Sequence, residues 1–178
     1  MSVTLSCWSC KTRMHDFFCI PEDQCMTTNS GRMYLYDGEN DAPAVLLETP
    51  IEGRPVLVEN PFGLSYVFRP VDKVVYGPQD PKRGDVFFHT ADKLHLYFAE
   101  VKLWHVSGWF KEGLRQLKGV VMDFIGAHPD VYGSSLLRRA FLCNPHHPRF
   151  AYSHANEIRD FRRETRFVLY PEGLIRIG

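Results

Sequence analysis

The sequence predicts an α/β fold in which a mixed central β-sheet is flanked by helices. Two stretches, residues 31–79 and 85–104, combine aromatic and β-branched residues with turn residues, which is typical of strands. A helical period follows over residues 107–126. From residue 84 the expected order is strand, strand, helix, strand, helix, strand. Because a helix between two extended segments permits a parallel crossover, we expect a mixed sheet covered by helices.

Length and composition fit a folded protein without a membrane partner. The chain has 178 residues, of which 44% are hydrophobic and 24% are charged, too apolar a composition for a disordered chain. No apolar run reaches the roughly 18 residues of a membrane helix, and charged residues replace a signal core near the N-terminus. Five cysteines cannot all pair with one another, which favours reduced thiols. We therefore expect a cytoplasmic protein.

Residues 1–60 are expected to form a Cys-containing extension of strands and loops that precedes a core at 61–178. Short β-like runs at 33–36, 44–47 and 55–59 are interrupted by Gly and Pro. The extension also holds four candidate zinc ligands: Cys7, Cys10, Cys19 and Cys25. The first pair has a spacing common in Zn²⁺ sites, but five residues separate the second pair, more than the usual two to four. A zinc knuckle would order this segment, and buried or unpaired cysteines are the alternative.

The elements of the expected core follow in chain order. A strand-like run at 64–76 comes first, and the runs at 85–89 and 94–104 then form a β-hairpin. Ser107 can cap the helix that continues to residue 126. A strand at 135–143 and a helix at 154–166 come next. Residues 167–177 form a terminal strand or a hairpin that turns at 171–173.

Three ionisable residues interrupt the apolar hairpin. Glu100 and Lys102 share one face of their strand because side chains alternate. If the hairpin loop has four residues, 91–94, the numbers of cross-strand partners sum to 185 and Asp85 lies opposite Glu100. A three-residue loop would instead place Asp85 opposite Ala99 and separate the carboxylates. Loop length therefore decides whether the two carboxylates meet.

Adjacent carboxylates repel unless a cation lies between them, and Mg²⁺ or Mn²⁺ suits oxygen ligands. The sequence thus predicts a metal site at Asp85 and Glu100, with Lys102 placed to orient water or stabilise charge during phosphodiester hydrolysis. The alternative is that Asp85 is a turn residue and that Glu100 and Lys102 lie on a solvated face.

This pattern resembles the PD-(D/E)xK nuclease superfamily, with its restriction-endonuclease-like fold, over residues 64–178. The resemblance implies that Asp85, Glu100 and Lys102 are catalytic, and that Gln116 contributes from the following helix. It further implies a metal-dependent endonuclease whose partner is nucleic acid, DNA rather than RNA, and which acts as a homodimer to cut both strands. The family often adds an acid from a helix before the first core strand. No helix is predicted there, and Glu59 is the nearest candidate.

That departure keeps a second hypothesis open. The chain would then be a catalytically inactive nuclease-fold module that binds a protein or nucleic-acid partner.

Charge is distributed unevenly although the net charge is zero. Residues 1–100 hold 9 Lys and Arg against 14 Asp and Glu, whereas residues 101–178 hold 12 against 7. The planar guanidinium suits phosphate, and Arg159, Arg162 and Arg163 are candidate phosphate ligands. The alternative is a charged outer helix face on which these arginines pair with Glu157 and Asp160.

Overall fold

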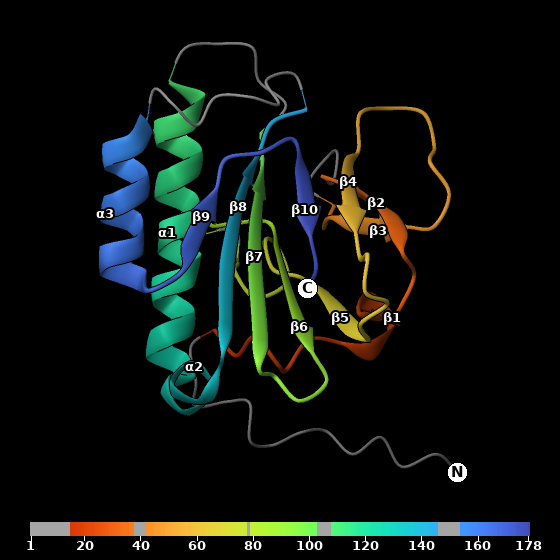
Figure 1. The fold of residues 1–178 in the computed structure, drawn as a ribbon, viewed down its shortest axis with the longest axis horizontal. Coiled ribbons are helices and arrows are strands. Elements are labelled where there is room, and N and C mark those ends of the chain that lie inside the picture. The colour runs from red at the N-terminus through yellow and green to blue at the C-terminus, as the bar shows by residue number, and fades with distance from the viewer. Residues whose placement is uncertain (1–14, 38–41, 78, 103–107, 146–153) are drawn as a thin grey trace.

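A computed structural model of the chain describes residues 15–37, 42–77, 79–102, 108–145 and 154–178. Figure 1 shows two helices on one side, a six-stranded sheet in the middle and a four-stranded sheet on the other side. Both sheets are mixed, which confirms the α/β class predicted from the sequence. Within the described ranges, no helix combines the length and apolarity needed to cross a membrane.

The six-stranded sheet contains the predicted hairpin at its centre. Its strands, in spatial order, are β1 (Met26–Thr28), β5 (Tyr66–Pro70), β6 (Val86–Thr90), β7 (His95–Val101), β8 (Leu137–Cys143) and β9 (Val168–Tyr170). Neighbours run antiparallel from β1 to β7, and β7, β8 and β9 run parallel. Strands β6 and β7 are buried almost throughout because both faces of the sheet are covered.

The helices connect and cover the parallel strands. They are α1 (Trp109–Ala127), α2 (Pro129–Ser134) and α3 (Ala155–Thr165), and a short 3-10 helix, η2 (Glu22–Gln24), lies near the start of the described chain. The apolar period of α1 is confirmed, since Phe110, Leu117, Val121 and Phe124 are buried. Gly108 occupies the N-cap position in a left-handed conformation, φ 89°. The predicted cap, Ser107, lies outside the described residues.

The four-stranded sheet receives the end of the chain. Its strands, in spatial order, are β10 (Leu174–Arg176), β4 (Val56–Glu59), β2 (Arg32–Tyr36) and β3 (Val45–Leu47). The hairpin considered for residues 167–177 is wrong, because β9 pairs with β8 whereas β10 pairs with β4. The turn at 171–173 instead carries the chain from one sheet to the other.

Segments on both sides of residue 60 contribute to each sheet. Strand β1 precedes residue 60 and pairs with β5, and β10 follows it and pairs with β4. The two sheets thus do not divide at residue 60. The division into an extension at 1–60 and a core at 61–178 stays a prediction.

The apolar core has two parts, one on each face of the central sheet. Between the sheets lie Met33, Leu35, Val58, Tyr66, Phe88, Tyr97 and their neighbours. Under the helices lie Phe17, Phe87, Phe98, Leu117, Phe124, Phe161 and their neighbours. A charged side chain on β6 or β7 therefore has little access to water, and a partner must offset the free energy that burial of its charge costs.

Candidate functional site

The central hairpin brings Asp85 to the end of β7 that carries Glu100. The loop between β6 and β7 has the four residues 91–94, and Val86 pairs with Ala99. Asp85 directly precedes β6 and lies next to this last pair. Its backbone N–H donates a hydrogen bond of 3.1 Å to the Ala99 carbonyl. The loop thus has the longer of the two lengths considered from the sequence, and β6 and β7 pair in the register that this length sets; direct pairing of Asp85 with Glu100 stays a prediction.

Asp85 is held rigidly at the start of β6. Its Oδ2 accepts a hydrogen bond of 2.6 Å from the N–H of Val101, and its carbonyl accepts one of 2.8 Å from the N–H of Val71. The preceding Gly84 allows α1 to pack closely, because a Cβ there would lie 2.7 Å from Cγ1 of Val120. The Asp85 residue is only 7% exposed.

Glu100 is completely buried beside this aspartate. Its Oε1 forms an ion pair with Nζ of Lys102, and its Oε2 has no hydrogen-bond partner within the described part of the chain. Burial and the charge of Asp85 raise the pKa of Glu100 well above its usual range. Burial and the charge of Asp37 likewise raise the pKa of Asp85, against the lowering effect of the Val101 hydrogen bond. Both carboxyls thus favour the uptake of a positive charge or a proton.

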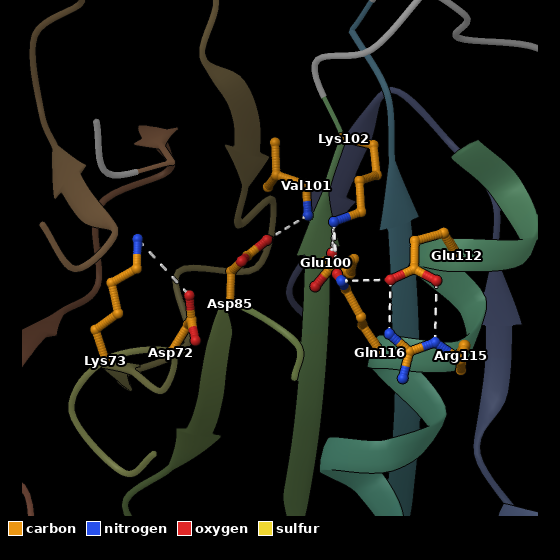
Figure 2. Close-up of polar contacts among 9 residues, drawn as sticks. All are labelled: Asp72, Lys73, Asp85, Glu100, Val101, Lys102, Glu112, Arg115 and Gln116. Carbon is orange, nitrogen blue, oxygen red and sulfur yellow. Dashed lines mark hydrogen bonds and ion pairs between the residues drawn. The ribbon is translucent and has the colours of Figure 1, made fainter. Parts of the chain in front are cut away.

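Lys102 is fixed by a chain of polar contacts to the surface of α1, shown in Figure 2. Its Nζ donates to Oε1 of Gln116 at 2.5 Å, and Nε2 of Gln116 donates to Oε1 of Glu112 at 2.9 Å. Arg115 in turn holds both carboxylate oxygens of Glu112. Burial lowers the pKa of Lys102, but the ion pair and hydrogen bond with Glu100, together with the charges of Asp85 and Asp37, raise it above its usual value. The lysine therefore keeps its proton at neutral pH.

Gly113 makes this contact chain geometrically feasible. A Cβ at this position would lie 2.6 Å from Cδ1 of Leu142 and 3.3 Å from Cγ of Lys102. The missing side chain lets the first turns of α1 approach the end of β7. Gln116 is then 3% exposed on an otherwise apolar helix face, a polar residue placed where it meets Lys102.

A small pocket of about 200 Å³ opens at this end of the hairpin. Asp85, Lys102 and Gln116 line it together with Asp37 and Asp72. Asp72 follows β5 and Asp37 follows β2 of the other sheet. Sequence analysis missed both acids, because the pairing of β5 with β6 brings Asp72 to Asp85 and the packing of the two sheets brings Asp37 there. The missed residue Glu112 had a usable signal, since it precedes Gln116 by one helical turn.

Glu59, the candidate additional acid, does not line this pocket. It lies on β4 of the four-stranded sheet, and its Oε2 is 3.5 Å from Nε of Arg176. Glu59 thus forms an ion pair between β4 and the edge strand β10, and its role as an additional acid stays a prediction. Asp37 and Asp72 are the acids that line the pocket together with Asp85.

None of the cysteines in the described part of the chain lines this pocket. Cys7 and Cys10 lie outside the described residues, so the four-cysteine zinc site stays a prediction. Cys19 and Cys25 line a separate hollow of about 830 Å³. The thiol of Cys25 is free, its Sγ lies 3.4 Å from Nη1 of Arg69, and burial raises its pKa.

The three candidate phosphate ligands also lie away from the pocket. Arg159, Arg162 and Arg163 project from α3 into a hollow beside the start of β8. Strand β8 starts at the end of the sheet remote from Glu100, because Leu137 pairs with His95 at the beginning of β7.

The site offers two buried carboxylates, of which Asp85 lines the pocket and the fully buried Glu100 does not, rather than a complete ligand cage. In the described ranges, no group of three or more His, Cys, Asp or Glu is arranged to hold a metal ion. Mg²⁺ is commonly bound through one or two carboxylates, with water and substrate phosphates as its other ligands. The pair of Asp85 and Glu100 fits this mode of binding, and the unpaired Oε2 of Glu100 is a donor atom without a partner in the described chain.

Comparison of the chain with models of protein families, with curated proteins and with solved structures finds no match. Function is therefore argued from the chemistry of the site.

Proposed function

We propose that this protein is a metal-dependent nuclease with a restriction-endonuclease-like core. Two features support the proposal. Asp85 begins one central strand, and Glu100, Val101 and Lys102 end the next, in the order of the PD-(D/E)xK pattern. The antiparallel strands β5, β6 and β7 are followed by α1 and the parallel strand β8, an order compatible with the mixed sheet that the resemblance implies.

One observation carries the argument for a metal ion. Two carboxylates are buried near each other at one end of the central hairpin, and one oxygen of Glu100 has no hydrogen-bond partner among the described residues. Mutual repulsion and burial would make this arrangement costly unless a cation or a proton is taken up. Asp85 and Glu100 would hold Mg²⁺ or Mn²⁺, which supplies polarisation of the phosphate and a lowered pKa of bound water.

The remaining polar residues prepare the site for a phosphodiester. Lys102 presents a protonated ammonium group that can orient the attacking water or stabilise charge that develops on the phosphate. Gln116 is a positioning residue, because it fixes the ammonium through a hydrogen bond and is itself fixed by Glu112. The preference for DNA and the pairing of two copies are part of the proposal and come from the resemblance alone.

Cleavage assays test the proposal directly. Single- and double-stranded DNA and RNA are incubated with the protein in Mg²⁺ or Mn²⁺. We expect cleavage that requires the metal and falls by at least about 100-fold in Lys102→Ala. The matched control is Lys111→Ala, which removes an exposed lysine from the first turn of α1 and should cleave like the wild type.

Thermal unfolding and a second variant distinguish loss of activity from loss of folding. Lys102→Ala leaves Glu100 buried without its ion pair, so thermal unfolding is compared with that of the control. Asp85→Asn is then titrated with Mn²⁺ in a calorimeter, where we expect the uptake seen in the wild type to be lost. Absence of cleavage on every substrate, or uptake that is unaffected by Asp85→Asn, overturns the proposal.

One observation favours the alternative, an inactive nuclease-fold module. Lys102 already neutralises one oxygen of Glu100, so the buried pair has a partner without any metal ion. A module of this kind would bind its protein or nucleic-acid partner but would neither take up Mn²⁺ at Asp85 nor cleave.

A further inference from the structure

A hollow lined by arginines lies at the opposite end of the central sheet from the candidate metal site. Its volume is about 800 Å³, and its cationic lining comes from two segments: Arg138, Arg159, Arg162, Arg163 and Arg166. Arg138 stands near the start of β8, the next three on α3, and the last at the end of α3.

Few of these positive charges are neutralised within the described chain. Arg163 pairs with Asp160 at 3.0 Å, but no carboxylate pairs with the other four among the described residues. The other acids of α3 are directed elsewhere, since Glu164 pairs with Lys118 and Glu157 with His154. The hollow therefore carries an excess of positive charge although the whole protein is neutral.

One arginine of the hollow is preorganised. Nη2 of Arg138 donates to the carbonyl of Ser135 at 3.0 Å, and its guanidinium lies 4.6 Å from the ring centroid of Tyr132. Cations near the C-terminus of a helix also stabilise its dipole, which accounts for Arg162 and Arg163. That effect does not account for Arg138 on a strand or for Arg159 in the first half of α3. Their convergence on one hollow favours recognition of an anion.

The distance between this hollow and the candidate active site can be counted in residues along β7 and β8. Along the paired strands, Arg138 lies opposite Leu96, and Leu142 lies opposite Glu100. Four residues of strand correspond to about 13 Å. A B-form duplex covers this distance in about four base pairs. The arginines therefore cannot contact the phosphate under attack but can hold the same duplex further along.

We propose that this arginine hollow is an anchoring site for the phosphate backbone of double-stranded DNA, separate from the site of cleavage. Guanidinium groups bind phosphate oxygens through paired hydrogen bonds. Single-strand-binding surfaces add aromatic side chains on which bases stack, whereas the residues between these arginines are Leu136, Leu137 and Val168. The inference rests on the proposed function for the identity of the polyanion.

The test measures binding in the absence of cleavage. Fluorescence anisotropy of a labelled DNA duplex is followed in EDTA over a range of salt concentrations. We expect Arg162→Gln/Arg166→Gln to weaken binding by at least about tenfold. The slope of log affinity against log salt should become shallower by about two, since each phosphate contact contributes about 0.9.

The matched control removes the same charge from the other sheet. Arg32 and Arg176 are exposed on β2 and β10, and Arg32→Gln/Arg176→Gln should bind like the wild type. Equal weakening in both double variants would overturn the inference, because a general charge effect would explain it. Tighter binding of duplex RNA or of single strands than of duplex DNA would also overturn it.

The outcome is separable from that of the proposed function. If the protein never cleaves but binding still depends on Arg162 and Arg166, the anchoring site stands and only the nuclease proposal fails. If cleavage occurs but neither arginine affects binding, the anchoring site fails alone.

Discussion

A buried polar side chain lies near each end of strand β6, and the two side chains differ in how completely they are hydrogen-bonded. At one end, His89 is 3% exposed and both ring nitrogens are used. Its Nδ1 donates to the carbonyl of Thr90 at 2.8 Å, and its Nε2 accepts from Nε of Arg69 at 2.9 Å. At the other end, beside Asp85, the Oε2 atom of Glu100 has no hydrogen bond within the described chain. A fully satisfied buried group serves the fold, and an unsatisfied one points to a missing partner.

Burial shifts pKa values in opposite directions at the two ends of β6. Burial lowers the pKa of His89 to about 4, because the charged imidazole would lose water and face Arg69. Burial instead raises the pKa values of Asp85 and Glu100. The same apolar surroundings thus disfavour a cation at one end and an anion at the other. Only the acidic end offers donor atoms to a ligand.

The largest expected difference between the two ends is in stability. His89→Ala should lower the free energy of unfolding by about 3 kcal/mol, because it leaves a cavity and a guanidinium N–H without its acceptor. Glu100→Gln/Lys102→Met should leave it unchanged or raise it by up to about 4 kcal/mol, because it replaces a buried ion pair. Denaturant unfolding of both variants measures this. Destabilisation of the double variant by as much as His89→Ala would show that the acidic end is structural too.

A smaller difference is expected in the dependence of stability on pH. His89 binds a proton more readily in the unfolded chain, so its contribution is present above pH 6.5 and declines as the pH falls towards about 4. Between pH 6.5 and 5 it should lose about 2 kcal/mol. The raised pKa values of Asp85 and Glu100 act in the opposite sense, so that their contribution declines as the pH rises.

Unfolding measured from pH 5 to 7 separates the two contributions. Relative to the wild type, His89→Gln should lose less stability on acidification, and Glu100→Gln/Lys102→Met should lose more. The same pH profile in the wild type and both variants would contradict the comparison.

The smallest expected effect concerns the helix that supports the acidic end. Gly113→Ala should cost about 1 to 2 kcal/mol, since overpacking against Leu142 and Lys102 exceeds the gain in helix propensity. Gly126→Ala, on the same helix with nothing within 4 Å of the added Cβ, should gain up to about 1 kcal/mol. Thermal unfolding of the two variants measures the difference. A gain in both would mean that α1 can move away from the site without cost.

The strong local patterns were predictable, and the reason is physical. The helical period of residues 107–126 and the apolar strands at 85–89 and 94–104 arise from contacts that repeat along the chain. The register of β6 against β7 was also predictable, once a four-residue loop was assumed. Helix α2 was not predicted, because six residues are too few to show a period.

The pairing of strands that lie far apart in the sequence was harder to predict. The destination of β10 depends on the four-stranded sheet, whose strands β4 and β2 lie more than a hundred residues earlier. Glu59 was chosen as an additional acid by its place in the chain and lies instead in an ion pair with Arg176. Position along the sequence carries no information about which sheet a short strand joins.

The sequence by itself determined the α/β class, the central hairpin and the three ionisable residues at its end, since alternation and helical spacing are local properties of the chain. Only the tertiary structure decided that Asp37 and Asp72 join Asp85 in one pocket, and that the arginines of α3 collect at the far end of the sheet. Side chains from distant segments meet only when two sheets and the helices pack, because burial of apolar area, which is not directional, brings them together.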